Sequence, residues 1–482
     1  MTSKQHSSWL IFSLVAIAQF MVVLDISITN VALPTIKQTL HFSNDSLQWV
    51  ITAYALTFGG FLLLGGRAAD LFGRRKTLLI GMLGFTAISF LIGISQSAVM
   101  LIGLRAIQGL AAALMSPSAL SIVLTTFREG HDRNKALGYW STIATGGAAV
   151  GLLLGGVLTQ YLGWRWNFFI NVPVGIIVSY FISQIVPLHE SEADHSDLDL
   201  PGAVLVTSGL IFLVFLISMA PIWGLFSFPV IGLFILAIVL LGAFVFNESK
   251  SKHPLIPLSI FKIRNVVGAN LMMAPMAATM FGNFYLLSLY IQTVMHYSPV
   301  LTGLSFLPFP IVMGYTSSRI AGFVSKYGYK RFLIAGPLLV AVSIALLTRL
   351  PVDGNYFINV LPSTILMPFG IGMTFMPIIA AATSGVAKDR SGLAAGLINT
   401  SQQMGGALGL SVLSGIAASV TASSVNLGKL GSAVRGYDQA FLVAVGFLLF
   451  AALLAFTIIK EKRHSKDQPA SGTAVRQQVS FD

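Results

Sequence analysis

Two charged side chains lie inside long apolar segments of the sequence, where charge is rare. Asp25 falls in the apolar run 9–31, and Arg105 falls in the run 99–126. A charge at mid-bilayer costs at least about 2.5–3.5 kcal/mol on insertion scales, so it needs a partner, a wet cavity or a proton. Asp25 could therefore bind and release a proton, or it could be a fixed hydrogen-bond partner between helices. Direct contact between the two charges does not follow from the sequence.

Arg105 cannot carry a proton itself because its guanidinium stays protonated. It could tune a neighbouring carboxyl or hold a chain of waters, or it could be a structural residue that binds backbone carbonyls. Gln108 and Gly109 follow at spacings of three and four, so the three residues share one helix face. Histidine is not found deep within an apolar run, so a proton relay through histidine is not expected.

A polar turn separates two of the apolar runs and reads Gly66-Arg-Ala-Ala-Asp70-Leu-Phe-Gly73-Arg74-Arg75-Lys76. Gly73 permits a tight turn. Asp70 could cap a helix N-terminus, where negative charge is favourable. The cations could contact lipid headgroups or carboxylates. Ordinary membrane-orienting charge is a sufficient explanation for Arg75 and Lys76.

Glycines recur every four residues in another apolar run. They are Gly147, Gly151 and Gly155, with Gly156 beside the last. Small residues at this spacing let helices approach closely in lipid. The run predicts a helix packing motif, and the sequence leaves open whether it also acts as a leak-tight pivot.

Long apolar segments must position all of these residues. The 482-residue chain is 55% hydrophobic and only 10% charged, whereas about 25% of residues in an average soluble domain are charged. Apolar runs of roughly 18 residues or more predict transmembrane helices. We count fourteen: 9–31, 47–66, 77–96, 99–126, 137–160, 167–187, 200–220, 224–246, 265–292, 299–323, 331–349, 357–384, 394–421 and 438–459. The fold class predicted is an all-α membrane protein.

The distribution of Lys and Arg predicts the orientation of these spans. Of 29 such residues, 23 fall on the side that holds both termini, 5 fall on the other side, and Arg105 lies within a span. Cytoplasmic loops carry the excess of cations, so we expect a multi-pass protein of the cell membrane with both termini in the cytoplasm. The net charge of +12 then requires no nucleic-acid partner. Asp25 is the one acid of 17 that falls inside a predicted span and not at its end.

Two stretches repeat and predict two halves. Residues Ala321–Arg331 resemble the turn at Gly66–Lys76, with Ser325 in place of Asp70, and Gly405-Gly406-Ala-Leu-Gly409 resembles the earlier glycine run. Repeated halves around a central site are a common transporter plan. The predicted organisation is a six-helix half (1–187), a link with two additional helices (188–264), a second six-helix half (265–460) and a disordered cytoplasmic tail (461–482).

In combination these motifs resemble the major facilitator superfamily, and within it the fourteen-span drug:proton antiporters, over nearly the whole chain. The motifs are Leu24-Asp25 to Asn30-Val-Ala-Leu-Pro34, the turn at Gly66–Lys76, Leu104-Arg105-Ala-Ile-Gln108-Gly109, the glycine run, and Gly163-Trp-Arg165-Trp166 to Gly175. The sequence departs from the family at Leu152, where proline is usual, and it lacks the additional acid that some members carry in the second half.

The resemblance implies a fold and roles for several residues. It implies the major facilitator fold, with two six-helix halves plus two extra linking helices. It implies that Asp25 and Arg105 take part in proton coupling, and that Asp70, Gly73 and Arg74 form a conformational latch between the halves. It implies no cofactor, no metal and no enzymatic activity, and it is consistent with a bacterial protein that works as a monomer.

Polar side chains within the spans are the candidates for a substrate cavity, because polar groups avoid lipid. Methionines at 272, 273, 276, 280, 373 and 376 could form adaptable apolar walls, although packing or contact with lipid is the favoured role for each of them. If the substrate is a cation, Asp25 could complement its charge, and drug and proton would then compete for one carboxylate. The cavity candidates are Asp25, Asn30, Gln108, Asn270, Asn283, Tyr285, Asn399, Gln402 and Gln403.

The function expected is proton-coupled export of hydrophobic, cationic drugs or toxic compounds by alternating access. A second interpretation is export of one specific metabolite, lipid-like compound or antibiotic on the same scaffold. A passive channel is less favoured, since channels usually assemble from identical subunits. An enzyme is disfavoured because the sequence has no nucleotide loop and no metal-ligating cluster.

Overall fold

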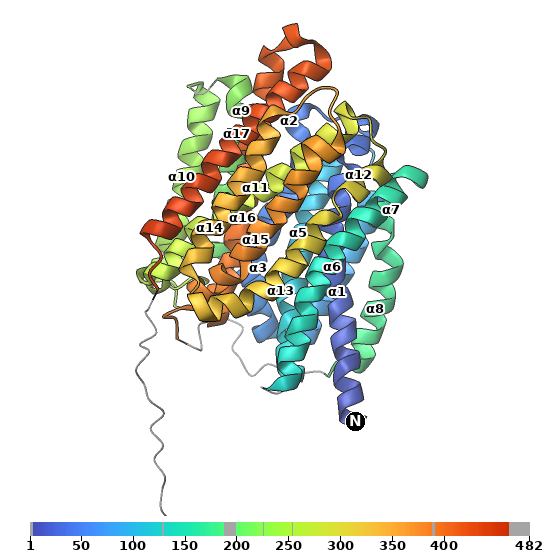
Figure 1. Ribbon diagram of the computed structural model, residues 1–482. Helices are drawn as coiled ribbons and strands as arrows, with labels where there is room; N and C mark the ends of the chain where they lie inside the picture. Colours follow the sequence, from blue (N-terminus) through green and yellow to red (C-terminus); the bar gives the residue numbers. More distant parts are fainter. Residues whose placement is uncertain are drawn as a thin grey trace, which may run out of the picture.

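The structure, a computed structural model, is an elongated bundle of helices (Figure 1). It describes residues 3–127, 130–187, 199–224, 226–252, 254–387 and 391–461. Within these ranges, 13 helices are long and apolar enough to cross a membrane. The remaining predicted span, 137–160, lies within α6, whose described apolar part, Gly146–Tyr161, is shorter. The all-α membrane class is therefore confirmed, whereas the predicted tail 461–482 lies outside the described residues except for Glu461.

The first group of helices follows the chain from its N-terminus. Two parallel contacts dominate it, since α3 packs along α5 and α1 packs along α6, and α4 covers both α5 and α8. The group comprises α1 (Ser3–Thr39), α2 (Asn44–Leu47), α3 (Trp49–Phe72), α4 (Arg74–Gly93), α5 (Ala98–Thr126), α6 (His131–Tyr161), α7 (Trp166–Phe169) and α8 (Asn171–Ile185).

The second group is arranged alike, with α11 along α16, and with α14 against α15 and α17. One predicted span, 299–323, is divided in two after Ser305, because Pro308 and Pro310 start a new helix and the residue before a proline avoids helical geometry. The group comprises α11 (Arg264–Leu289), α12 (Pro299–Ser305), α13 (Pro308–Tyr327), α14 (Lys330–Ala345), α15 (Leu361–Thr383), α16 (Ser391–Ser423) and α17 (Gly428–Thr457).

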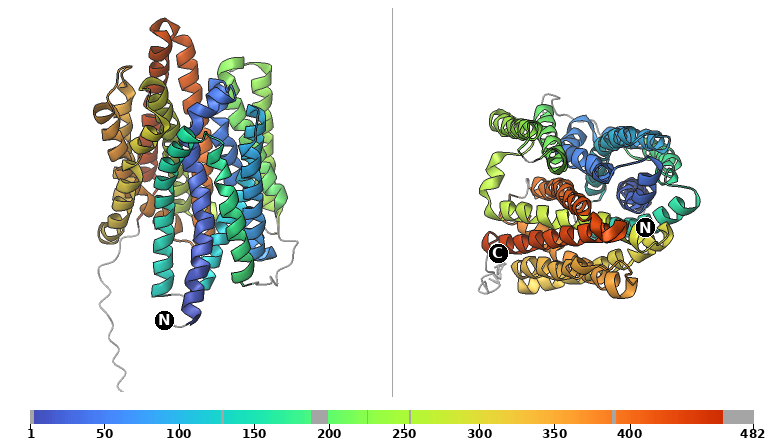
Figure 2. Two further views of the ribbon diagram at one scale, coloured as in Figure 1. Left: turned by 90° about the vertical axis from the view of Figure 1, so that its right-hand side faces the viewer. Right: turned by 90° about the horizontal axis from the view of Figure 1, so that it is seen from above.

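The linking helices α9 (Leu200–Trp223) and α10 (Phe228–Lys250) form a hairpin at the edge of the bundle (Figure 2). α10 exposes large apolar side chains such as Phe228 and Phe246, as expected for a surface in contact with lipid. α9 packs against α3 of the first group and α16 of the second. The hairpin therefore lies over the one edge where these two helices meet.

Helix α1 is longer than predicted because it does not end at Pro34. A proline inside a helix removes the hydrogen bond to the carbonyl four residues earlier, here that of Asn30. The Ser288 hydroxyl on α11 donates to this carbonyl at 2.9 Å. Neighbouring hydroxyls commonly satisfy such freed carbonyls in membrane helices, so α1 continues to Thr39.

The repeated turns have the same backbone geometry. Gly73 between α3 and α4 has φ 91°, and Gly328 between α13 and α14 has φ 81°, a region that favours glycine. Cations at these turns also satisfy helix ends, where carbonyls lack partners. Arg75 donates to the carbonyls of Ser183 and Val186 at the end of α8, with 2.9 Å for the latter. Lys330 donates to the Phe456 carbonyl of α17 at 2.9 Å.

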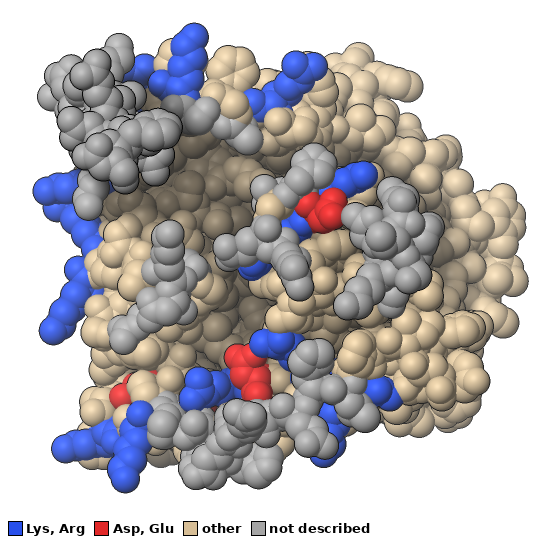
Figure 3. All heavy atoms as spheres, turned by 90° about the horizontal axis from the view of Figure 1, so that it is seen from below, with Lys and Arg blue, Asp and Glu red and all other residues tan. Residues whose placement is uncertain are grey.

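The two ends of the bundle differ in charge. We call the end where α1 begins and α17 finishes the N-terminal face, and the other end the opposite face (Figure 1). Lys and Arg side chains gather around the N-terminal face, which is hollowed between them (Figure 3). This hollow leads into the site.

Candidate functional site

Asp25 and Arg105 form a buried ion pair. α1 and α5 cross so that a guanidinium nitrogen of Arg105, Nη1, donates to Asp25 Oδ2. The Asp25 side chain is 0% exposed and the Arg105 side chain is 1% exposed. A buried charge without a partner is strongly destabilising, whereas a paired one is tolerated. The structure therefore brings together the two charges whose contact the sequence left open.

Polar groups of α5 and of two more helices complete this network. Gln108 Nε2 donates to Asp25 Oδ1 at 3.0 Å and to the Ser89 hydroxyl of α4 at 2.9 Å. Arg105 Nε donates to the Val50 carbonyl of α3 at 3.0 Å. The guanidinium carbon lies 4.4 Å from the centroid of the Tyr54 ring, a cation–π distance. Both carboxylate oxygens are thus bound, and the pair is anchored within the first helix group.

The glycine run positions α1 beside this network. A Cβ atom added to Gly151 would lie 3.1 Å from the Leu24 carbonyl oxygen, and one added to Gly155 would lie 3.0 Å from Ile28 Cα. Gly147 faces the same helix at Phe20 and Val23. These three glycines therefore let α6 touch the backbone of α1 on both sides of Asp25, as small residues do in membranes.

Gly156 packs against a different helix, α12 of the second group. A Cβ there would lie 2.6 Å from the Pro299 carbonyl oxygen and 2.9 Å from Val300 Cα, both in α12 of the second group. A Cβ on Gly303 would in turn lie 3.1 Å from the Leu152 carbonyl carbon. The departure of Leu152 from the proline usual in the family thus falls at this crossing of α6 and α12.

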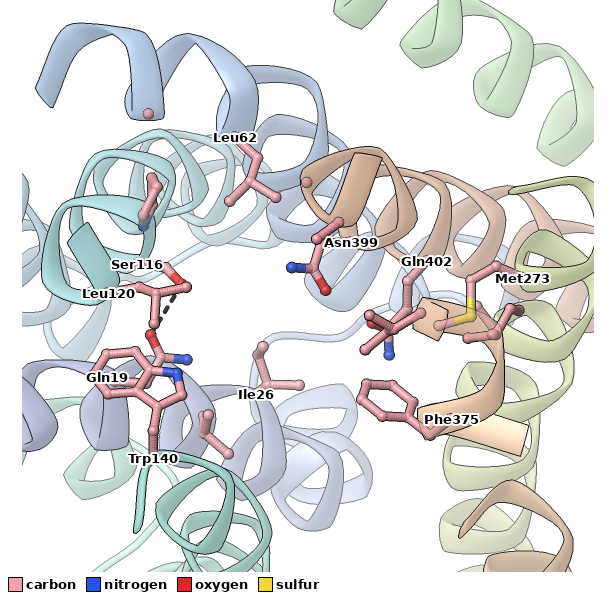
Figure 4. Close-up of a pocket in the computed structure, with 18 of the residues that line it drawn as sticks. Gln19, Ile26, Leu62, Ser116, Leu120, Trp140, Met273, Phe375, Asn399 and Gln402 are labelled. Atoms are coloured by element: carbon pink, nitrogen blue, oxygen red, sulfur yellow. Dashed lines mark hydrogen bonds between the residues drawn. The ribbon is translucent and has the colours of Figure 1, made fainter. Parts of the chain in front are cut away.

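A cavity of about 1270 Å³ lies between the two helix groups. It reaches the N-terminal face, since Arg67 and Asp70 near the end of α3 and Gly392 at the start of α16 line it. Its wall is mostly apolar and includes the predicted methionines 273, 276, 280 and 376. Asn399 and Gln402 of α16 point into the space, across from Gln19 and Trp140 (Figure 4).

Three of the nine cavity candidates line this wall: Asn30, Asn399 and Gln402. The amide of Asn30 donates to its own helix, at the Ile26 carbonyl, at 2.9 Å. The other six lie outside the wall in this conformation. Asp25 and Gln108 belong to the ion-pair network, and Gln403 lines a separate small pocket. Asn270 accepts from Ser401 at 2.7 Å, and Asn283 and Tyr285 are buried in α11.

Asp25 points away from the cavity because it lies on a different face of α1 from the residues of the cavity wall. Val23, Ile26 and Asn30 line the wall together with Gln19, which is the 19, 23, 26, 30 spacing of one helix face. Asp25 precedes Ile26 and is rotated by about 100° from it. In this conformation the Asp25 carboxylate does not line the cavity, and the competition between drug and proton stays a prediction.

Sequence reasoning missed Gln19 as a wall residue. Its Oε1 accepts from the Ser116 hydroxyl of α5 at 2.9 Å, and both side chains line the cavity. The sequence did contain a signal for this role, because the spacing of Gln19 and Asn30 places both on one face of the helix. A search for polar residues on one face of α1 would have found it.

The opposite face is closed by contacts between the two groups. Besides the bond from Ser288 to Asn30, Gln292 Nε2 donates to the Val31 carbonyl at 2.9 Å. Ser414 of α16 donates to the Gln48 side chain at the start of α3. The cavity is consequently accessible from the N-terminal face only, as far as the described residues define it.

The predicted latch residues lie at the mouth of the cavity. Asp70 Oδ1 is 3.8 Å from Arg74 Nη2, with side chains 59% and 32% exposed, respectively. Gly73 provides the turn between them. A salt bridge this exposed contributes little stability. Both residues belong to the first helix group, so this pair does not itself join the two groups, and the latch stays a prediction.

Besides Asp25, two further acids lie within the long helices, so the prediction of a single acid within the spans was wrong. Asp438 lies inside α17, which begins at Gly428 and is longer than the predicted span, and its Oδ1 accepts from the Leu350 backbone at 3.1 Å. Glu248 is 3% exposed near the end of α10 and accepts from the Ile256 backbone at 3.1 Å. Asp25 remains the acid held at the centre of the first group.

Comparison with known proteins shows the family. Residues 15–410 match the Major Facilitator Superfamily. The chain is 39% identical to the puromycin resistance protein pur8 of Streptomyces alboniger, covering 95% of this chain and 92% of that protein. It is 36% identical to the cephamycin export protein CmcT of Amycolatopsis lactamdurans, covering 94% and 93%, respectively.

Solved structures show the same fold. The crystal structure of the POT family transporter PepTSo superposes with a TM-score of 0.69 at 18% identity, covering 94% of this chain and 97% of that one. This likeness, together with the family match, confirms the predicted major facilitator fold, to which α9 and α10 are the additional pair. The chain belongs to the Major Facilitator Superfamily and is a multi-pass membrane transporter, not an enzyme.

Proposed function

We propose that this transporter exports hydrophobic drugs or antibiotics in exchange for protons, by alternating access. The observation that carries the proposal is the pairing of a large apolar cavity, open at one face, with a buried carboxylate just behind its wall. The cavity volume of about 1270 Å³ exceeds the usual 300–1000 Å³ of small-molecule pockets. It therefore has room for a drug-sized molecule and water.

The N-terminal face is assigned to the cytoplasm. Its rim carries the Lys and Arg side chains (Figure 3), and cations are enriched on the cytoplasmic side. The structure then corresponds to a transporter that takes up its substrate from the cytoplasm or the inner leaflet. We propose that one chain suffices, because the cavity is enclosed by helices of a single chain.

Proton coupling is assigned to the Asp25–Arg105 pair. Protonation would neutralise Asp25 and remove its attraction to Arg105, which would then lose a charged partner. Because Asp25 lies off the cavity wall, we propose that proton and drug act on each other through helix position and do not compete for the same atom. The acids that line the cavity, Asp70 and Asp199, lie at its mouth, so a cationic substrate would first meet them there.

Export of one particular antibiotic is the second candidate. The two relatives reported above are each named for a single compound, puromycin and cephamycin. Few polar groups project into the cavity, and an adaptable methionine wall favours a broad range of substrates over a single antibiotic. The range of compounds decides between the two candidates.

A resistance profile tests the proposal. The protein is produced in cells that lack their own efflux pumps, and growth is measured against a panel that includes puromycin, a cephamycin and unrelated hydrophobic cations. Resistance to several chemical classes supports multidrug export, and resistance to one supports the specific exporter. Drug accumulation that is unaffected by a protonophore, with the protein present in the membrane, would contradict proton coupling.

A further inference from the structure

A second, much smaller pocket lies between the ion pair and the large cavity. Its volume is about 10 Å³, and its wall includes Tyr54 and Arg105 of the first helix group and Gln403 of the second. A volume of this size is about that needed for one water molecule. Ile26, Ile51 and Phe281 line both this pocket and the large cavity, so three apolar side chains separate them.

Two of the residues that line this pocket each have a polar side-chain atom without a hydrogen-bond partner among the residues that the structure describes. These atoms are the hydroxyl oxygen of Tyr54 and the amide nitrogen of Gln403. The two residues are 2% and 7% exposed, respectively. Buried polar groups are nearly always hydrogen-bonded to protein or to ordered water, so both atoms point to a ligand that can accept and donate.

The two residues come from helices of different groups that approach closely. A Cβ added to Gly59 of α3 would lie 2.7 Å from Gln403 Cβ of α16. Ser414 and Gln48 join the same two helices nearer the opposite face. A movement that opens that face must separate α3 from α16 there and thereby alter the pocket.

We propose that this pocket binds one water molecule, which bridges the Gln403 amide to the Tyr54 hydroxyl and so connects the ion-pair network to the second helix group. The amide donates to the water, and the water exchanges a hydrogen bond with the hydroxyl. The Tyr54 ring in turn lies against the Arg105 guanidinium. Gln403 is thereby a positioning residue that couples the charge state of the pair to the position of α16.

The groups that surround Asp25 allow this coupling. Among the described residues, Arg105 of α5 and Tyr54 of α3 are the charged and titratable ones beside it, whereas α4 contributes Ser89 and α6 contributes glycines. A proton on Asp25 weakens its hold on Arg105, and Arg105 then moves relative to the Tyr54 ring. The role in coupling rests on the proposed function, but the water site itself does not.

The test uses spin labels, which the cysteine-free chain allows at chosen positions. Cysteines replace Val99 and Val425, which are 81% and 75% exposed at the opposite face, one in each helix group. Pulsed electron resonance on the protein in lipid nanodiscs then reports the ratio of open to closed molecules across a pH series. Tyr54→Phe keeps the ring and removes only the hydroxyl, and Gln403→Met keeps the length of the side chain.

Each single variant is expected to change the open-to-closed ratio about fivefold, the worth of one net hydrogen bond, and the double variant is expected to change it no further. Gln184→Met is the control, because Gln184 is exposed near the end of α8, which packs against α4 and α1, and it should leave the ratio unchanged. Multiplying effects in the double variant, or unchanged ratios in both singles, would overturn the coupling. A high-resolution structure with no ordered water between Tyr54 and Gln403 would overturn the water site, even if Asp25→Asn abolishes the pH response and so supports the proposed function.

Discussion

The hydrogen bond from Ser288 to the Asn30 carbonyl is expected to stabilise closure of the opposite face. Ser288 is 0% exposed, and its hydroxyl lies 2.9 Å from that oxygen. Pro34 cannot supply the helical partner of this carbonyl, since proline lacks an N–H. Ser288→Ala therefore removes a bond between the two groups and leaves a buried acceptor without its donor.

The size of the effect follows from this geometry. An unsatisfied buried group costs about 1–3 kcal/mol, but side-chain bonds inside membrane proteins average about 0.6 kcal/mol with a maximum near 1.7. Taking about 1 kcal/mol, the ratio of open to closed molecules rises about fivefold. Gln292→Met removes the neighbouring bond to the Val31 carbonyl and should add a change of similar size.

The labels at positions 99 and 425 measure this ratio directly. Thr279→Val is the matched control, because Thr279 is also fully buried on α11 but donates within the second group only, to the Pro275 carbonyl of its own helix at 3.1 Å and to the Ala444 carbonyl of α17 at 3.4 Å. An unchanged ratio in folded Ser288→Ala protein, or an equal shift in Thr279→Val, would refute the reasoning that the freed carbonyl holds the face closed.

Three further predictions concern packing, helix ends and the cavity. Gly155→Leu should destabilise the protein by about 2 kcal/mol or more through overpacking against α1, whereas Gly146→Leu should be tolerated because nothing lies within 4 Å of its added Cβ; melting in detergent measures both. Arg75→Gln should lower the melting temperature through the loss of about 1 kcal/mol at the end of α8, and exposed Lys76→Gln should not. Gln402→Leu should change resistance to polar antibiotics about fivefold in growth assays, with no loss of protein in the membrane.

The membrane architecture could be predicted because it depends on local properties of the chain. Apolar length and the placement of Lys and Arg identify helices without reference to their neighbours. The ends of α1 and α17 could not be placed in this way. α1 passes Pro34 because Ser288, far along the chain, satisfies the freed carbonyl, and no local pattern contains that contact.

The ion pair and the cavity, too, could be predicted from the sequence only in part. Asp25 and Arg105 were identifiable by type and burial, because charges inside spans are few. Their contact depends on how α1 and α5 are rotated against each other. The rotation that places Asn30 and Gln19 on the cavity wall turns Asp25 away from it, so a list of polar residues within spans mixes wall residues with packing residues.

Drug-driven proton movement would show directly whether export is coupled to protons. Purified protein is reconstituted in vesicles that contain a trapped pH-sensitive dye, and a drug gradient is imposed without a pH gradient. Proton-coupled export through Asp25 predicts proton movement opposite to the drug, and it predicts no such movement in Asp25→Asn protein that is monodisperse and folded. Drug movement at an undiminished rate with no accompanying change in internal pH would contradict proton-coupled export.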